Sequence, residues 1–331
     1  MSISRKIYDQ ILKEYDEKQL AVLKKLKAKT AALERELPQL SLINSQIASN
    51  AVESAIAGIR ASASSAGIKY DHQRKLAELM AAKENILQNA GYSLKDLEAS
   101  YSCELCKDSG FTDGEPCICF KRRLTDLLYD SYGIREVLQH ENFDNYSLKY
   151  YDSTPSSKTD TESPAAAAKK AYAAAKEFVA NFPVSSDNLL ICGETGVGKT
   201  FLANCIAKEL LDRGFFVIYL SSVRFFDLLA ESQFRSDRDS SDHITDYIRS
   251  CDLLIIDDLG TELVNSFVHS SFFNCINERL LAKRHTIIST NLSIMQIRDT
   301  YSERIFSRIA KDYKLIKLYG KDIRIIKKME A

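Results

Sequence analysis

The chain has 331 residues, 45% of them hydrophobic and 27% charged, which is enough for one sizeable α/β core and a second, smaller unit. Lys and Arg together number 45, as do Asp and Glu, so the formal net charge is zero. A neutral chain does not attract nucleic acid through the electrostatic field of the whole protein, so any such contact has to be local. The sequence has neither a signal peptide nor an apolar run of about 18 residues, so we expect a cytoplasmic chain with no membrane partner. In that compartment its eight cysteines are expected to be thiols or metal ligands rather than disulfides.

Residues 1–101 are predicted to be almost wholly helical. Apolar side chains from Leu23 to Leu37 recur at alternating three- and four-residue steps, and Pro38 ends or kinks that helix. Two further helical patterns follow, one fading near residues 64–67 and one covering about 70–89. Because the apolar seam covers only about two heptads, it favours a helical hairpin or three-helix bundle over a long coiled coil.

Four cysteines mark residues 102–149 as a candidate zinc-binding module with a connector. Their spacing is Cys103-x2-Cys106-x10-Cys117-x-Cys119, within a short stretch that contains glycine. Four thiols this close in a cytosolic chain suit tetrahedral Zn²⁺, whose binding free energy folds a segment with little core. An iron–sulfur cluster and plain thiols remain as alternatives, because the second pair is Cys-x-Cys rather than Cys-x2-Cys.

Residues 150–164 lack apolar periodicity and are predicted to be a linker, followed by the largest domain at residues 165–331. Pro164 opens an alanine-rich helix that extends to about Phe182. Beyond it, apolar strands alternate with helices, which predicts an α/β fold with a parallel sheet flanked by helices. The strands are expected at residues 188–192, 215–220, 253–256 and 285–290, and the helices at 199–212, 222–234, 241–250 and 265–282.

A phosphate-binding loop joins the first of these strands to the following helix. It has the pattern Gly-x4-Gly-Lys-Thr and consists of Gly193, Glu194, Thr195, Gly196, Val197, Gly198, Lys199 and Thr200. Between a strand and a helix, the backbone N–H groups of such a loop and the helix start cradle phosphates. We expect Lys199 to reach the β- and γ-phosphates of ATP, and the Thr200 hydroxyl to bind Mg²⁺.

Two carboxylates follow the apolar strand at residues 253–256. Because unpaired buried charge is costly, a buried strand that finishes in Asp257 and Asp258 indicates a function. Asp257 is expected to hold Mg²⁺ together with Thr200, and Asp258 to orient or deprotonate the attacking water. The alternative, a pair of aspartates that cap the next helix, is disfavoured by the phosphate loop.

Four further polar side chains are candidates on weaker grounds. Asn291 follows the strand at residues 285–290 and would lie at the ligand edge of a parallel sheet, unless it is a plain turn residue. Arg304 and Arg308 stand at positions i and i+4 on one helix face, where a solvated surface pair is the alternative. Arg324 is a further candidate for a phosphate contact.

The order of these motifs is specific. Gly-Glu-Thr-Gly-Val-Gly-Lys-Thr is followed by Leu-Leu-Ile-Ile-Asp-Asp-Leu-Gly-Thr-Glu, Ser-Thr-Asn-Leu, Glu-Arg-Ile-Phe-Ser-Arg-Ile and Tyr-Gly-Lys-Asp-Ile-Arg. Over about residues 186–328, this succession resembles the AAA+ ATPases of the bacterial DnaC/DnaI helicase-loader family, a group that includes the ATP-binding subunit of insertion-sequence transposition. The segment from Phe143 to Tyr146 is similar to the one that precedes the core in many members.

The resemblance implies a fold and several residue roles. The fold is an AAA+ P-loop ATPase whose sheet has the strand order 5-1-4-3-2. Asn291 is implied as the first sensor of the γ-phosphate and Arg324 as the second. Arg308 is implied as an arginine finger, with Arg304 beside it. One departure is Asp258, since most AAA+ proteins carry glutamate there, and this leaves the rate of hydrolysis open.

The resemblance also implies partners. A chain of this family binds ATP and Mg²⁺, self-assembles with ATP, and delivers a hexameric replicative DNA helicase onto single-stranded DNA at the initiation of replication. A zinc module joined to such a core resembles the DnaI-like loaders, in which the N-terminal region engages the helicase, so residues 1–101 are expected to dock the partner. Two alternatives are a transposition regulator that acts on duplex DNA and a transposase, and a nucleotide-gated adaptor with little hydrolysis.

Contacts with single-stranded DNA require cations beside aromatic faces. Arg224, Phe225 and Phe226 offer this combination on a predicted helix, unless the two phenylalanines belong to the core. The most basic stretch extends from Lys311 to Lys328, and it is equally interpretable as a solvated face.

Overall fold

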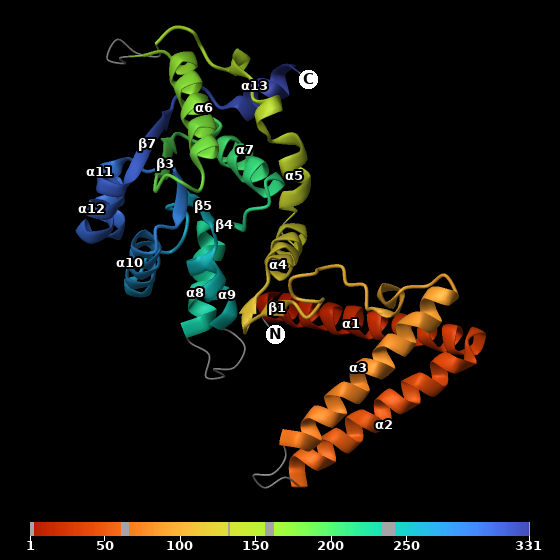
Figure 1. Cartoon of the computed structure of the whole chain (residues 1–331). Coiled ribbons are helices and arrows are strands. Elements are labelled where there is room, and N and C mark those ends of the chain that lie inside the picture. The colour runs from red at the N-terminus through yellow and green to blue at the C-terminus, as the bar shows by residue number, and fades with distance from the viewer. Residues whose placement is uncertain (1–2, 61–65, 132, 156–161, 234–241, 331) are drawn as a thin grey trace. The chain divides into compact units, whose positions relative to one another are not determined.

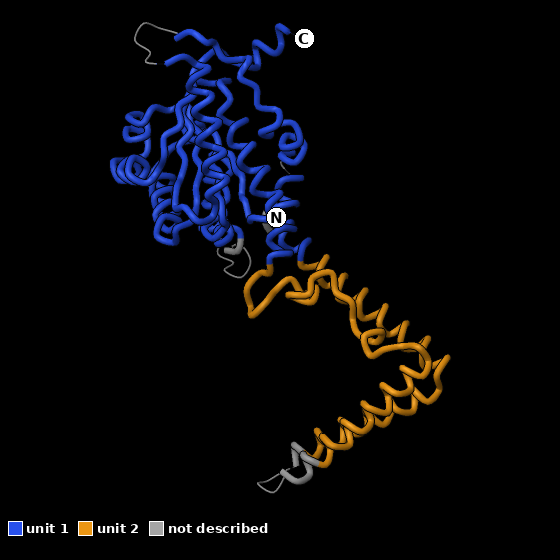
Figure 2. Tube along the Cα trace, turned by 45° about the horizontal axis from the view of Figure 1, so that its top comes forward, with its two compact units in different colours: residues 1–11, 118–331 blue, residues 12–117 orange. Residues whose placement is uncertain are grey.

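The computed structural model describes residues 3–60, 66–131, 133–155, 162–233 and 242–330. The chain divides into two compact units, one formed by residues 1–11 and 118–331 and the other by residues 12–117 (Figure 2). The domain boundaries proposed from the sequence stay a prediction, and residues 156–161 of the proposed linker lie outside the described residues. None of the described helices is long and apolar enough to cross a membrane.

The N-terminal region is helical, as predicted. α1 (Ile3–Glu36) is followed after one residue by α2 (Pro38–Arg60), so Pro38 occupies the first turn of a new helix, where its missing N–H has no partner to lose. α3 (Ala66–Asn89) packs along α2 as a hairpin (Figure 1). A small apolar cluster stabilises the end of this hairpin, formed by Leu33, Leu40 and Leu87 with the partly buried Leu37, Ile86, Tyr92, Leu94 and Leu97.

Short elements connect this region to the core. A 3-10 turn, η1 (Leu94–Leu97), precedes the two-residue strands β1 (Phe111–Thr112) and β2 (Glu115–Pro116), which form an antiparallel hairpin in the cysteine-rich segment. The next elements are α4 (Ile118–Ser131), α5 (Ile134–His140), η2 (Phe143–Asn145), η3 (Leu148–Tyr150) and α6 (Pro164–Asn181). Ser163 caps α6 by accepting a hydrogen bond from the N–H of Ala166.

The core is a five-stranded parallel sheet (Figure 1). Its strands are β3 (Asn188–Gly193), β4 (Val217–Ser221), β5 (Leu253–Leu259), β6 (His285–Thr290) and β7 (Tyr313–Leu318). They are ordered β4-β5-β6-β3-β7. Counted from β3 as the first, this is the order 5-1-4-3-2 that the family resemblance implied, and the expected α/β fold is confirmed.

Helices connect the strands of the sheet, and one more follows the last strand. The connecting helices are α7 (Lys199–Asp212), α8 (Ser222–Gln233), α9 (Asp242–Ser250), α10 (Ser266–Leu281), α11 (Ile294–Tyr301) and α12 (Glu303–Asp312), and α13 (Ile323–Glu330) follows β7. Strands β3, β5 and β6 are almost continuously buried, as parallel strands covered on both faces are.

Strand β7 corrects the interpretation of the basic tail. Tyr313, Ile316 and Leu318 of this strand are buried, whereas Lys314 and Lys317 are exposed. The strand pairs with β3 alone, at the edge of the sheet. Lysines are common on edge strands because they discourage pairing with a further strand. Here the lysines obscure the apolar pattern of β7 in the sequence, so that the strand was interpreted as part of a basic stretch.

A buried arginine holds the N-terminal end of β6 in place. Arg279 of α10 is 0% exposed. Its guanidinium donates hydrogen bonds to Thr286 Oγ1 and to the backbone carbonyls of Ile248, Arg249, Cys251 and His285. The carbonyls near the C-terminus of α9 carry partial negative charge, which offsets the buried cation. These bonds connect α9, α10 and β6 at the edge of the sheet opposite the candidate site.

Candidate functional site

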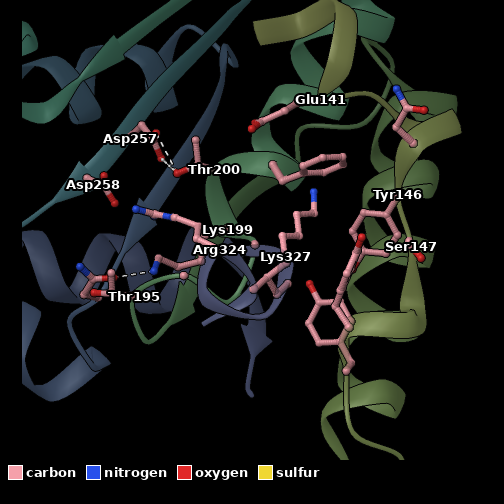
Figure 3. Close-up of a pocket in the computed structure, with 18 of the residues that line it drawn as sticks. Glu141, Tyr146, Ser147, Thr195, Lys199, Thr200, Asp257, Asp258, Arg324 and Lys327 are labelled. Carbon is pink, nitrogen blue, oxygen red and sulfur yellow. Dashed lines mark hydrogen bonds between the residues drawn. The ribbon is translucent and has the colours of Figure 1, made fainter. Parts of the chain in front are cut away.

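A cavity of about 540 Å³ lies at the carboxyl edge of the sheet. Among the residues that line it are Thr195, Gly196, Gly198, Lys199, Thr200, Asp257, Asp258, Asn291 and Arg324. Figure 3 shows Asp257 and Asp258 on one side of this cavity, Tyr146 and Ser147 on the opposite side, and Lys199 and Arg324 between them. The structure thus brings together predicted site residues from four separate stretches of the chain.

The phosphate loop begins where β3 ends, and α7 begins at its lysine. Lys199 is buried, and its ammonium donates hydrogen bonds to the Glu194 carbonyl at 2.7 Å and to Asn291 Oδ1 at 2.5 Å. Burial lowers the pKa of Lys199, while the carboxylates of Asp258 and Asp257 act in the opposite direction. A cation with few water contacts is suited to a buried anionic ligand.

Two contacts hold the phosphate loop from outside. The Tyr151 hydroxyl donates to the Val197 carbonyl at 2.9 Å, and the N–H of Ile323 donates to the Gly196 carbonyl at 3.0 Å. A Cβ at Gly196 would lie 2.1 Å from the Asp322 side chain, and one at Gly198 would lie 2.7 Å from the Tyr151 hydroxyl. Both glycines also have positive φ, of 81° and 97°, so the motif's glycines are required for space as well as for conformation.

The opposite wall of the cavity is aromatic. The rings of Tyr146 and Phe201 meet edge to face with centroids 6.0 Å apart, and Lys327 places its ammonium 5.2 Å from the centre of the Tyr150 ring. All four side chains line the cavity. Aromatic faces beside a few polar groups suit a planar ligand such as a nucleobase.

Sequence reasoning missed this wall and the Tyr151 contact. Tyr151 is buried, although it belongs to the segment proposed as a linker. The available signal was three tyrosines within six residues, at positions 146, 150 and 151, just ahead of the predicted domain. Large aromatic side chains bury extensive surface, so a cluster of them is unusual in a solvated linker.

Asp257 is 7% exposed and accepts hydrogen bonds from three hydroxyl groups. Tyr219 of β4 donates to Oδ2 at 2.7 Å, Thr200 of α7 donates to Oδ2 at 3.1 Å, and Ser289 of β6 donates to Oδ1. A buried carboxylate held by hydroxyl groups beside a phosphate loop is a suitable ligand for Mg²⁺, with Thr200 as its neighbour. Neither Tyr219 nor Ser289 was singled out from the sequence.

Asp258 lies inside β5, which continues three residues beyond the predicted end of the strand. Its φ is 55°, and the pairing register of β5 with β6 shifts between Ile256 and Leu259. Burial raises the pKa of the Asp258 carboxyl, with Asp257 acting in the same direction and Lys199 opposing it. A raised pKa at a cavity wall is typical of a carboxylate that exchanges protons with a ligand or water.

The two predicted finger arginines lie on α12, and neither lines the cavity. Arg304 is exposed, whereas Arg308 is half-buried and donates to Asn277 Oδ1 at 2.8 Å. The Arg308 guanidinium also lies 5.2 Å from the centre of the Phe273 ring. The role proposed for both arginines stays a prediction.

The proposed DNA contact on α8 is not supported. Phe225 is 0% exposed and Phe226 is 5% exposed, so neither ring offers a face for base stacking. Arg224 forms an ion pair with Glu231 at 3.5 Å. The alternative interpretation, that these phenylalanines belong to the core, is the correct one.

The four cysteines of the candidate zinc module lie together. The sulfur atoms of Cys103, Cys106, Cys117 and Cys119 are all within 4.8 Å of one another, and those of Cys103 and Cys117 are 3.9 Å apart. Tetrahedral zinc with Zn–S bonds of about 2.3 Å places its ligand sulfurs about 3.8 Å apart, so this donor set fits the ion. The Asp108 carboxylate accepts the N–H groups of Ser102 and Cys103 and orients the first ligand.

We predict that Tyr151→Phe weakens ATP binding about fivefold, because the loop loses a hydrogen bond at the Val197 carbonyl, worth about 1 kcal/mol, that holds it in its binding arrangement. Titration calorimetry with a non-hydrolysable ATP analogue measures the change. Tyr172→Phe is the matched control, since Tyr172 packs behind Tyr146 without lining the cavity. An unchanged dissociation constant for Tyr151→Phe would show that this contact does not shape the loop.

We predict that Cys106→Ser lowers the zinc content from about one ion per chain to near zero, because the site loses one of its thiolate ligands. Zinc released into a chromogenic chelator from the purified protein measures the content. Cys275→Ala, which changes a buried cysteine of α10, should retain the metal. Full zinc content in Cys106→Ser would contradict the assignment, and visible charge-transfer absorption in the unmodified protein would favour an iron–sulfur cluster.

The chain is similar to several known proteins. Residues 164–331 match the model of the family described as IstB-like ATP binding protein. The replicative helicase loader DnaC of Escherichia coli (strain K12) is 24% identical over 181 residues, which cover 55% of this chain and 67% of that protein. The crystal structure of the DnaC helicase loader matches with a TM-score of 0.46 at 21% identity, covering 55% of this chain and 99% of that chain. The crystal structure of DnaI matches with a TM-score of 0.45 at 23% identity, covering 56% of this chain and 93% of that chain.

The family match includes the phosphate loop, both carboxylates and the C-terminal helix with Arg324. It extends over half of the chain and confirms the family identified from the order of the motifs. The chain belongs to the family of IstB-like ATP binding proteins.

Proposed function

We propose that this chain is an ATPase that loads a replicative DNA helicase onto single-stranded DNA at the initiation of replication, in the cytoplasm. The observation that carries the ATPase activity is the convergence of the phosphate loop, Asp257, Asp258 and Asn291 on one cavity. Likeness to the DnaC loader, at 24% identity, supports the loading role.

The residues of the cavity fit ATP with Mg²⁺. Lys199 and the N–H groups of the loop would hold the β- and γ-phosphates, and Arg324 would approach them from α13. Thr200 and Asp257 would hold Mg²⁺, and the ion would supply positive charge to neutralise the negative charge that develops during phosphoryl transfer. Asp258 would orient the attacking water and accept its proton, and Asn291 would respond to the γ-phosphate through the amide that now contacts Lys199.

A second copy of the chain completes this mechanism. Arg304 and Arg308 lie outside their own cavity, which is where an arginine finger that acts on a neighbouring subunit has to be. ATP at the junction of two copies would then favour self-assembly, because each nucleotide binds groups from both chains.

The loading role is tested by co-elution. We predict that the full-length chain with ATP co-elutes in gel filtration with the hexameric replicative helicase of the same organism. Lys199→Ala, which removes nucleotide binding, should abolish the increase in complex that ATP causes. Arg249→Ala, which changes an exposed arginine on α9 outside the cavity, is the control. Failure of the unmodified chain to co-elute with any ratio of helicase would refute the loading role.

The trans-acting arginine is tested by mixing two inactive variants. We predict that Arg308→Ala lowers ATP hydrolysis at least about 100-fold without changing ATP affinity, because the finger acts only on transferring phosphate. Asp258→Asn should be equally inactive. Mixing the two should restore phosphate release in the presence of single-stranded DNA, because one junction then combines an intact Asp258 with an intact Arg308. No recovery on mixing would place the arginine's action within its own chain.

Two other functions are distinguished by the same samples. The family resemblance also supports a transposition regulator, which would form ATP-dependent filaments on duplex DNA without binding the helicase. Asp258, in place of the usual glutamate, favours an adaptor that binds ATP with little hydrolysis. Rapid phosphate release that Asp257→Ala abolishes would exclude the adaptor.

A further inference from the structure

Ser289 of β6 is a fully buried residue whose hydroxyl contacts both acids of the candidate site. Its Oγ donates a hydrogen bond to Asp257 Oδ1 and accepts one from the backbone N–H of Asp258 at 2.9 Å. A hydroxyl has one proton and two lone pairs, so these two bonds use it in its two different capacities. They form a directional chain from the Asp258 backbone through Ser289 to the Asp257 carboxylate.

The need for this hydroxyl comes from an irregularity in the sheet. Ile256 pairs with Ile288 and Leu259 pairs with Thr290, so Asp257 and Asp258 have no pairing partner on β6. A bulge of this kind leaves a backbone N–H without a ladder acceptor, and a buried N–H without a partner is costly. The Ser289 hydroxyl takes the place of the missing carbonyl at Asp258.

The same irregularity sets the conformation of Asp258. Its φ of 55° lies in the left-handed region, which aspartate tolerates better than most residues but which still has to be stabilised. Its carbonyl accepts hydrogen bonds from the hydroxyls of Ser222 and Thr261, both at 3.0 Å, while its N–H is held by Ser289. Bulges beside ligand sites commonly redirect a side chain, and here the redirected side chain is one that lines the cavity.

We propose that Ser289 is a positioning residue that sets both acids of the ATP site at once: it fixes the Asp257 carboxylate toward Thr200 for Mg²⁺, and it maintains the bulge that presents Asp258 to the attacking water. The proposal rests on the ATP site described above and adds a residue to it. It does not depend on helicase loading. It also explains how an aspartate serves where a longer glutamate is usual, because the bulge, and not the side-chain length alone, determines where the carboxylate lies.

Two neighbouring hydroxyl groups allow the positioning of Asp257 to be tested separately from the maintenance of the bulge at Asp258. Tyr219 donates to Asp257 Oδ2 at 2.7 Å and has no bond to the Asp258 backbone, whereas Ser222 bonds the Asp258 carbonyl and not Asp257. Tyr219→Phe is therefore a probe of the metal-holding carboxylate. Ser222→Ala is a probe of the bulge.

The experiment measures two quantities on the full-length chain. The first is the Mg²⁺ concentration that half-saturates binding of a fluorescent, non-hydrolysable ATP analogue, which requires no hydrolysis. The second is kcat for phosphate release at saturating Mg²⁺ and ATP. Ser289→Ala should raise the half-saturating Mg²⁺ concentration about tenfold, as loss of a ligand-orienting partner typically does. It should also lower kcat about tenfold. Tyr219→Phe should change mainly the first quantity, and Ser222→Ala mainly the second.

Rescue and folding controls make the outcome decisive. Ser289→Thr retains the hydroxyl and should restore both quantities to within about threefold of the unmodified chain. Ser289→Cys, whose thiol is somewhat larger than the hydroxyl and forms weaker hydrogen bonds, covers the case in which the alanine variant fails to fold. Thr125→Val removes a buried hydroxyl of α4 outside the cavity, and shows what such a loss does to thermal stability alone.

A change in only one of the two quantities for Ser289→Ala, or a lowered melting temperature with both quantities unchanged, would overturn the shared positioning role. Absence of Mg²⁺-dependent nucleotide binding in the unmodified chain would instead refute the ATP site itself. These two failures are distinguishable because the second is read on the unmodified protein.

Discussion

The buried carboxylate of Asp257 is the constraint on which the candidate site depends. A carboxylate that is 7% exposed is tolerated only where hydrogen bonds replace its lost hydration, and here the donors are the hydroxyls of Tyr219, Thr200 and Ser289. They come from β4, α7 and β6, so one charge fixes three elements relative to β5. The phosphate loop is held in place by the same charge that is expected to hold its metal ion.

The sequence indicated the residues that line the cavity better than those that position them. The phosphate loop, Asp257 and Asn291 were accessible because their motifs follow apolar strands, and parallel strands bring their carboxyl ends to one edge. The strand order was available only through the family resemblance. No role was assigned to Ser289 or Tyr219, although Ser289 stands in the Ser-Thr-Asn-Leu motif, because their importance arises from a bulge and from a neighbour 32 or 38 residues away. Strand β7 was missed because exposed Lys314 and Lys317 mask its apolar side.

The phosphate loop is also where the two ends of the ATP-binding core meet. Tyr151 precedes the core and bonds Val197, while Ile323 begins the last described helix and bonds Gly196. Both bonds end on backbone carbonyls of the loop, so the segment before the core and α13 hold the loop in the arrangement that is expected to bind phosphate.

The distribution of positive charge argues for a site that binds before it hydrolyses. Lys199, Arg324 and Lys327 line the cavity from the same chain, whereas Arg308 is held on α12 by Asn277 and Phe273. The three cations of the cavity attract a triphosphate, but the charge that develops on a transferred phosphoryl group requires further neutralisation at its outer oxygens. If Arg308 supplies it from a neighbouring copy, hydrolysis is confined to assembled chains. ATP would then persist while the assembly forms and be consumed only once it is complete.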